Sequence, residues 1–103
     1  MREANDMDFE NAVTRTGVTL VDFGATWCPP CKALLPIIET LAEEYAERVS
    51  VVKVDTDESP ETASTFGVMA NPTVILFNDG QPVEKLVGLR PIEVYRTALN
   101  KYV

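Results

Sequence analysis

The chain has 103 residues, and this length predicts a single domain covering residues 1–103. Hydrophobic residues make up 46% and charged residues 24%, a composition that is typical of a globular protein and argues against a disordered one. Sixteen acidic and nine basic residues give a formal charge of −7, which disfavours nucleic acid and anionic membranes as partners. Because there is no histidine, serine–histidine catalysis, cysteine–histidine catalysis and histidine-ligated metals are excluded.

No apolar run approaches the roughly 18 residues that a helix needs to cross a bilayer. The N-terminal sequence MREANDMDFE is acidic and polar, whereas a secretory signal begins with basic residues and continues with apolar ones. We therefore expect a cytoplasmic protein, although a chain whose leader had been removed would have the same sequence. We also expect a monomer.

The first half of the chain predicts a β-α-β unit that follows a short helix. Asp8 is a capping residue and predicts a short helix that ends near Gly17. The nearly continuous apolar run Val18–Phe23 predicts a strand buried on both faces in a parallel sheet. Beyond Cys31, apolar residues at intervals of three and four predict a helix of about four turns. The run Val49–Asp55 predicts the next strand, with a right-handed crossover between the two.

The second half predicts a short helix, a hairpin and a closing helix. Ser59, an N-cap residue followed by proline, predicts the start of the short helix. The strands Thr73–Phe77 and Val83–Val87 flank the turn residues Asp79–Gly80, which indicate an antiparallel hairpin. An amphipathic helix follows Pro91. The whole order predicts an α/β fold, with a central mixed sheet of four or five strands flanked by helices on both faces.

Cys28 and Cys31 are the only cysteines, and they are separated by Pro29 and Pro30. A disulfide framework would use more cysteines spread along the chain, and a structural zinc or iron–sulfur site takes about four ligands. A Cys-x-x-Cys pair next to a β-α-β pattern indicates a redox pair. A cluster shared by two chains and a chance pairing remain the alternatives.

The cysteine pair is predicted to lie where the first long strand ends and the long helix begins. A helix N-terminus offers free N–H groups and a partial positive charge, which favour a thiolate, the attacking species in disulfide exchange. We expect Cys28 to be accessible to a partner and to act as the nucleophile. We expect Cys31, one turn further on, to be more buried and to resolve the mixed disulfide. Pro29 and Pro30 fit a first helical turn and stiffen the loop between the sulfur atoms.

Several separated segments resemble the thioredoxin family in order and spacing. They are Val21–Lys32, which contains the cysteine pair, the segment Phe66–Thr73, and the glycines Gly80 and Gly88. The resemblance extends from about Asp6 to the C-terminus. It implies a thioredoxin-like fold for nearly the whole chain.

The resemblance implies a thiol–disulfide oxidoreductase that reduces protein disulfides through Cys28 and Cys31. It implies no bound cofactor other than the redox-active disulfide itself, and no metal. The implied partners are disulfide-containing target proteins and a flavin-dependent thioredoxin reductase. Two alternatives remain: a thiol oxidant or disulfide isomerase of the same fold, and a non-catalytic docking module whose cysteines matter little.

The resemblance also assigns roles to two charged residues in the predicted strands. It implies that Asp22 is a buried base that exchanges the Cys31 proton, and that Lys53 in the neighbouring strand is its charge partner. From the residues alone, Asp22 could instead be a strand-end acid that reaches water, and Lys53 a solvated lysine.

The resemblance further implies a cis peptide bond before Pro72, opposite Cys28, and a substrate-binding surface around the pair. The residues of that surface are Trp27, Pro29, Pro30, Asn71, Pro72, Val87 and Gly88. Without the resemblance, Trp27 would be expected in the core. Three residues depart from the family pattern: Pro29 replaces a glycine, Gly24 stands where a second tryptophan is common, and Asn71 replaces an aliphatic residue. We expect the polar Asn71 to change which partners dock.

Overall fold

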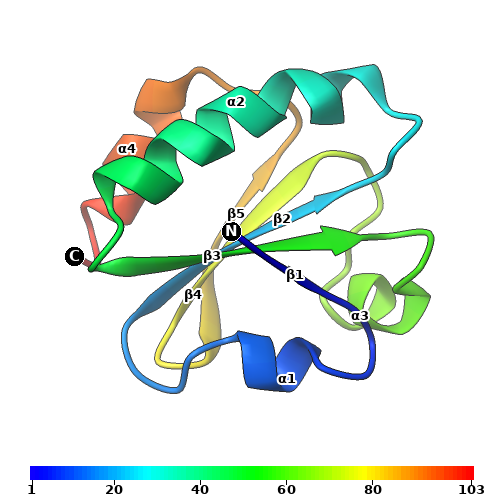
Figure 1. The fold of residues 1–103 in the computed structure, drawn as a ribbon, viewed down its shortest axis with the longest axis horizontal. Coiled ribbons are helices and arrows are strands. Elements are labelled where there is room, and N and C mark those ends of the chain that lie inside the picture. The colour runs from blue at the N-terminus through cyan, green and yellow to red at the C-terminus, as the bar shows by residue number, and fades with distance from the viewer.

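The computed structural model describes residues 1–103 as one mixed β-sheet with two helices on each face (Figure 1). The strands are β1 (Arg2–Ala4), β2 (Val18–Gly24), β3 (Val49–Asp55), β4 (Thr73–Asn78) and β5 (Gln81–Val87). The helices are α1 (Phe9–Ala12), α2 (Pro29–Glu44), α3 (Pro60–Thr65) and α4 (Ile92–Leu99). Helices α2 and α4 cover one face, and α1 and α3 cover the other. None of the four helices has the length and apolar character that crossing a bilayer requires.

The five strands lie in the order β1-β3-β2-β4-β5. Strand β3 pairs in parallel with both β1 and β2, whereas β2–β4 and β4–β5 are antiparallel. The predicted mixed sheet, the β-α-β unit and the hairpin are therefore confirmed. Since β2 and β3 are parallel, their C-terminal ends lie at the same end of the sheet. The loops that lead to α2 and α3 leave from that end.

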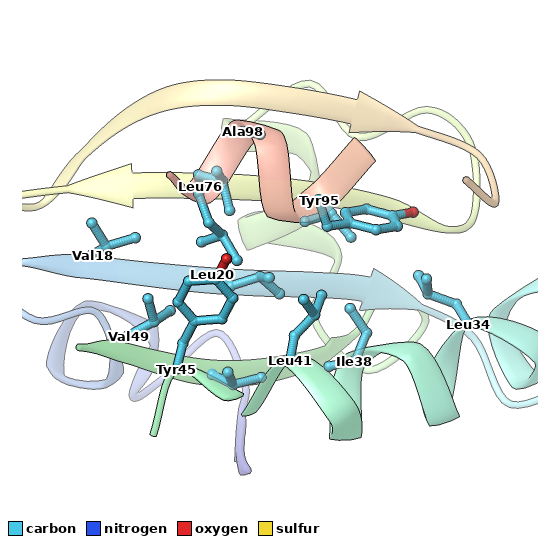
Figure 2. Packing of buried hydrophobic residues seen from close by; sticks show 13 residues of the cluster. Val18, Leu20, Leu34, Ile38, Leu41, Tyr45, Val49, Leu76, Tyr95 and Ala98 are labelled. Atoms are coloured by element: carbon cyan, nitrogen blue, oxygen red, sulfur yellow. The ribbon is translucent and has the colours of Figure 1, made fainter. Parts of the chain in front are cut away.

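The alternating side chains of the central strands form a core on each face of the sheet. On one face, Leu20 and Leu76 from the strands pack against Leu34, Ile38 and Leu41 of α2 (Figure 2). Burying each of these large side chains contributes about 1.5–3 kcal/mol. The spacing of three and four that predicted α2 is therefore the spacing of its buried face.

The opposite face is built around four phenylalanines. Phe9 of α1 lies 5.4 Å from Phe66 and 5.8 Å from Phe77, measured between ring centroids. Phe66 and Phe77 meet edge to face at 5.1 Å, and Phe23 of β2 completes the group at 6.2 Å from Phe9. This cluster fixes α1 and the end of α3 to the sheet.

Two elements at the N-terminus differ from the prediction. Strand β1 was not predicted: it has three residues at the edge of the sheet, and only Ala4 is buried, so it shows no apolar alternation. The first helix was predicted to end near Gly17, which is wrong, because α1 ends at Ala12 and Val13 has an extended backbone. The next residue, Thr14, donates its N–H to the hydroxyl of Thr19 over 3.2 Å, which a continued helix would prevent.

The cap of α3 also differs from the prediction. Ser59 occupies the N-cap position, but its hydroxyl is buried and makes no hydrogen bond. The carboxylate of Asp6 takes that role instead. It accepts the N–H of Glu61 over 3.2 Å, the N–H of Thr62 over 2.8 Å and the hydroxyl of Thr62 over 2.7 Å. A residue far away in the sequence therefore caps this helix.

Candidate active site

The cysteine pair lies at the start of α2, at the end of the sheet where β2 terminates. Cys28 is the N-cap of α2, and Pro29 and Pro30 occupy the first two positions of the helix. Since neither proline has an N–H, the first backbone donor of the helix belongs to Cys31. This N–H donates to Sγ of Cys28 over 3.3 Å. The two cysteines form a disulfide, and their Cα atoms are 5.3 Å apart.

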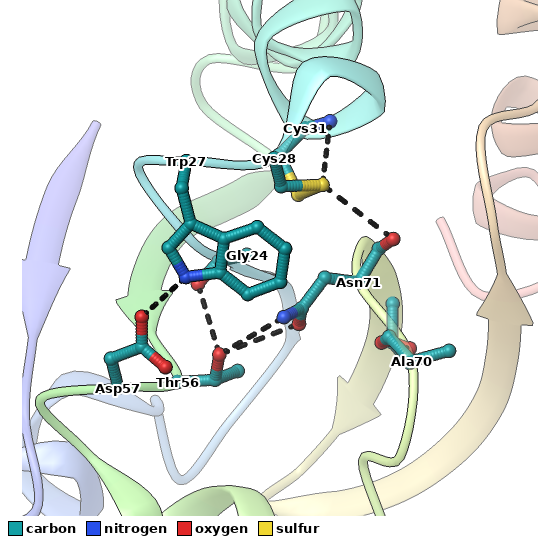
Figure 3. The surroundings of a disulfide bond; sticks show 9 residues. Gly24, Trp27, Cys28, Cys31, Thr56, Asp57, Ala70 and Asn71 are labelled. Atoms are coloured by element: carbon teal, nitrogen blue, oxygen red, sulfur yellow. Dashed lines mark hydrogen bonds between the residues drawn. A yellow bond between two sulfur atoms is a disulfide. The ribbon is translucent and has the colours of Figure 1, made fainter.

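The predicted accessibility of the two cysteines is wrong. Cys28 is only 3% exposed, whereas Cys31 is half-buried. Cys28 is covered because its Sγ lies 3.6 Å from the carbonyl oxygen of Asn71, in the loop before β4 (Figure 3). Cys31 lines a surface cavity. The sulfur atoms therefore have different surroundings, a tertiary effect that the helix position alone did not reveal.

The cavity beside Cys31 has a volume of about 250 Å³. Its lining residues are Asp22, Gly24, Ala25, Thr26, Cys31, Lys32, Leu35 and Lys53. Asp22 is buried, and its Oδ1 accepts no hydrogen bond. Burial raises the pKa of Asp22 from its ordinary value of 3.8 to about 6, against the opposing effect of the Lys53 charge. Asp22 is therefore not a strand-end acid in water but a buried carboxyl that shares a cavity with Cys31.

Lys53 is the strand neighbour of Asp22 in the β2–β3 register. Both residues line the cavity, yet their charged groups form no ion pair. Lys53 acts on Asp22 through space, and its lowering effect on the Asp22 pKa is smaller than the raising effect of burial. The structure thus brings the two together without a direct contact.

Gly24 lies beside both the Asp22 carboxylate and the Cys31 sulfur. A Cβ atom at Gly24 would stand 3.2 Å from Sγ of Cys31 and 4.0 Å from Oδ1 of Asp22. The first distance is tighter than ordinary van der Waals contact, so a side chain here would press on Cys31. The departure of Gly24 from the family pattern therefore keeps the space between carboxylate and sulfur open.

Trp27 and the loop before β4 border the other side of the disulfide (Figure 3). The Asn71–Pro72 peptide bond is cis, as the resemblance implied. Trp27 is 66% exposed, so it is not a core residue, and its Nε1–H donates to Oδ2 of Asp57 over 2.6 Å. The side chain of Asn71 reaches Thr56, which follows β3. Asp57 and Thr56 were not predicted, because their contacts join loops that are distant in the sequence.

The remaining predicted residues lie around this end of the sheet with different exposures. Pro29 and Pro30 are exposed and Pro72 is buried. Val87 is exposed at the end of β5, and Gly88, which has a positive φ of 85°, donates its N–H to the carbonyl of Pro72 over 2.8 Å. Met69 and Leu89, in the neighbouring loops, are exposed apolar side chains as well. They were not predicted, because their exposure cannot be read from the sequence.

The site can exchange two electrons between its own thiols and another disulfide. The two sulfur atoms are within bonding reach, a backbone N–H supports Cys28, and a carboxylate faces the cavity of Cys31. No group of three or more cysteine, aspartate or glutamate side chains is arranged to hold a metal ion.

Comparison with known proteins gives the same result for sequence and for structure. Residues 1–101 match the sequence model of the thioredoxin family. Thioredoxins from several strains of Staphylococcus aureus are 46% identical over 101 residues, which is 98% of this chain and 96% of the relative. A solved structure of a mutant thioredoxin from Halobacterium salinarum has a TM-score of 0.90 at 36% identity, over 98% of this chain and 88% of that chain.

These matches cover the whole fold, including the segment that carries the disulfide. The members of the family reduce protein disulfides and carry their redox group as an intrinsic cysteine pair, so they need no cofactor. The chain, with its Cys28–Cys31 disulfide at the start of α2, belongs to the thioredoxin family of thiol–disulfide oxidoreductases.

Proposed function

We propose that Cys28 attacks the disulfide of a target protein and that Cys31 then resolves the mixed disulfide. One observation carries this assignment, namely the difference between the two sulfur atoms. Sγ of Cys28 accepts the first N–H of α2, which supports a thiolate, whereas Cys31 shares its cavity with Asp22. The attacking thiolate and the thiol that must later lose a proton therefore have separate partners.

In the first step, the Cys28 thiolate attacks one sulfur of the target disulfide. A bond forms between Cys28 and that sulfur, the target S–S bond breaks, and the other target sulfur leaves as a thiolate. Target and protein are then joined through a mixed disulfide. No outside oxidant or reductant takes part in this exchange.

In the second step, Cys31 loses its proton and attacks Sγ of Cys28. The Cys28–Cys31 bond forms, the mixed disulfide breaks, and the second target sulfur leaves as a thiolate that takes up a proton. Asp22 accepts the Cys31 proton, because a carboxyl whose pKa is raised to about 6 is mostly ionised at neutral pH but binds a proton more readily than an exposed aspartate. Gly24 leaves the space for this transfer open. Overall, two electrons pass from the dithiol to the target.

The target docks on the exposed apolar side chains around the disulfide. Trp27, Met69, Val87 and Leu89 are all exposed, and they come from three segments: the loop before α2, the loop before β4, and the end of β5 with the loop that follows it. Extended target backbone pairs with the backbone of Asn71, in the manner of an added strand. The charge of Lys53, which also lines the cavity, favours the ionised form of Asp22.

The oxidised protein must be reduced again after each cycle. We assign this step to a flavin-dependent thioredoxin reductase, which supplies two electrons to the Cys28–Cys31 disulfide. A compartment that keeps thiols reduced supports such a cycle, and we therefore assign the protein to the cytoplasm.

The test is capture of a disulfide-containing protein by reduced Cys31→Ser protein. We expect a stable mixed disulfide through Cys28, seen as a band that disappears on reduction, because the resolving thiol is missing. The matched control, Cys28→Ser, retains a single thiol as well but forms at least tenfold less adduct, on the order expected for loss of the activated sulfur.

Equal adducts from the two variants would contradict the assignment of nucleophile and resolving thiol. If the oxidised wild-type protein introduced disulfides into a reduced substrate and the reduced protein reduced none, the protein would be an oxidant of the same fold. Adduct formation by Cys31→Ser with normal reduction by the wild type supports the reductase.

A further inference from the structure

The side chain of Asn71 points into the protein rather than toward a partner (Figure 3). Its Nδ2 donates to the hydroxyl of Thr56 over 3.2 Å. The same hydroxyl donates to the carbonyl oxygen of Gly24 over 3.3 Å. One side chain, that of Thr56, thus joins the end of β2 to the loop before β4. The polar side chain of Asn71 therefore contacts Thr56 within the site rather than a bound target.

We propose that Thr56 is a positioning residue: through the Asn71 amide, it holds the Asn71 carbonyl oxygen against Sγ of Cys28 and so limits the ionisation of the Cys28 thiol. This inference rests on the function proposed above, because it concerns the thiolate that attacks the target. It gives a role to the polar side chain of Asn71, which stands where the family usually has an aliphatic residue.

The Cys28 sulfur lies between one hydrogen-bond donor and one acceptor. The N–H of Cys31, at 3.3 Å, stabilises the thiolate. The Asn71 carbonyl oxygen, at 3.6 Å, can accept a hydrogen bond only from the thiol and repels a thiolate. The balance between these two contacts sets how readily Cys28 ionises. The donor is fixed by the first turn of α2, whereas the acceptor is held in place through a side chain.

Other charges around Cys28 stay the same when Thr56 or Asn71 is changed. The titratable or charged groups near the pair are Cys31, Asp22, Lys32 and Lys53 on the side of the cavity, and Asp57 beyond the Trp27 indole. None of these groups hydrogen-bonds to Thr56 or Asn71 through a side chain. A change in Cys28 ionisation would therefore report the position of the Asn71 carbonyl.

Substitution of Thr56 can remove the hydroxyl without breaking the fold. The N–H of Thr56 also donates to the Gly24 carbonyl, over 2.9 Å, and this bond survives in Thr56→Val. Thr56→Ser retains the hydroxyl and serves as the rescue. Asn71→Leu removes the other partner and leaves the contact between Thr56 and Gly24 intact.

The experiment measures the pH profile of Cys28 alkylation by iodoacetamide, in a Cys31→Ser background where Cys28 is the only thiol. In Thr56→Val and in Asn71→Leu, we expect the midpoint to fall by about half a unit, the size that loss of one weak hydrogen bond to the thiol allows. Thr56→Ser retains the parent midpoint. The double variant shifts no further than either single variant, because both break one interaction.

The control is Thr40→Val, which removes a hydroxyl that donates to the Pro36 carbonyl over 3.0 Å on the exposed side of α2. It leaves the midpoint unchanged. The inference is overturned if the midpoint is unchanged or raised in Thr56→Val and Asn71→Leu. It is also overturned if the control shifts as much as these variants, or if the shift doubles in the double variant. Because the assay contains no target protein, this failure is distinct from a failure to reduce targets.

Discussion

Asp6 and Asp22 each lie near the first turn of a helix that begins with proline, but their carboxylates have opposite environments. Asp6 caps α3 and accepts three hydrogen bonds from Glu61 and Thr62. These bonds, chiefly the one from the Thr62 hydroxyl, hold the pKa of Asp6 below its ordinary value. Asp22 borders the cavity at α2, its Oδ1 has no partner, and burial raises its pKa to about 6.

The comparison separates a carboxylate that stabilises the fold from the one to which we assign the proton transfer. At neutral pH the ionised Asp6 is more favourable in the folded protein than in the unfolded chain, and the ionised Asp22 is less favourable. At α3 a carboxylate occupies the N–H groups of the helix start, whereas at α2 the first N–H remains available to Cys28. The two helix starts look alike in sequence and differ in what their donors bind.

The largest expected effect is that of Asp22→Asn on stability. Because the folded pKa is raised from 3.8 to about 6, the contribution of Asp22 to stability is greatest below about pH 4 and falls by about 3 kcal/mol as pH rises through about 6. The neutral amide avoids this loss. We expect Asp22→Asn to raise the free energy of unfolding by about 2–3 kcal/mol at neutral pH, measured by urea denaturation of the oxidised protein.

The same measurement at about pH 4 is the control, because both proteins then carry a largely neutral group at this position. There the difference between variant and wild type should be small. An equal gain at both pH values would mean that the carboxylate charge is not its cause, and the contrast with Asp6 would lose its basis.

A smaller effect of opposite sign is expected for Asp6→Ala. The variant loses three hydrogen bonds at the start of α3, so its midpoint of thermal unfolding should fall by several degrees at neutral pH. Since the folded pKa of Asp6 is lowered, its contribution is present above its ordinary pKa of 3.8 and is lost as pH falls through the lowered value. The gap to the wild type should therefore narrow in acid.

Removal of an exposed acid without such bonds is the matched control. Glu43→Ala, on the exposed side of α2, should leave the midpoint nearly unchanged, because Glu43 makes no ion pair or side-chain hydrogen bond. If Glu43→Ala lowered the midpoint as much as Asp6→Ala, general charge effects would account for both.

Features that depend on local patterns could be predicted from the sequence. The apolar run of β2, the three-and-four spacing of α2 and the Asp79–Gly80 turn each require only neighbouring residues. The turn is an instructive case, since both residues have positive φ, 53° and 83°, as a tight hairpin turn demands. The position of the cysteine pair followed from the elements around it.

Features that depend on contacts between distant segments could not be predicted. The cover that Asn71 places on Cys28 joins residues 43 positions apart, and the Asp6 cap on Thr62 joins residues 56 positions apart. Neither contact leaves a periodic pattern in the sequence. Ser59 illustrates the result: its position before Pro60 is that of a capping serine, yet the folded chain supplies a stronger acceptor.

The smallest expected effect, that of Ser59→Ala, tests this directly. Replacing an N-cap serine with alanine usually costs about 0.5–2 kcal/mol. The Ser59 hydroxyl is buried and has no hydrogen-bond partner, so its removal should cost nothing and should stabilise the protein by about 1 kcal/mol or less in urea denaturation. Thr62→Val, which removes the hydroxyl that Asp6 binds, should be destabilising. If Ser59→Ala instead lowered the free energy of unfolding by about 0.5–2 kcal/mol, the serine would cap α3. Asp6 would then be a secondary support rather than the cap.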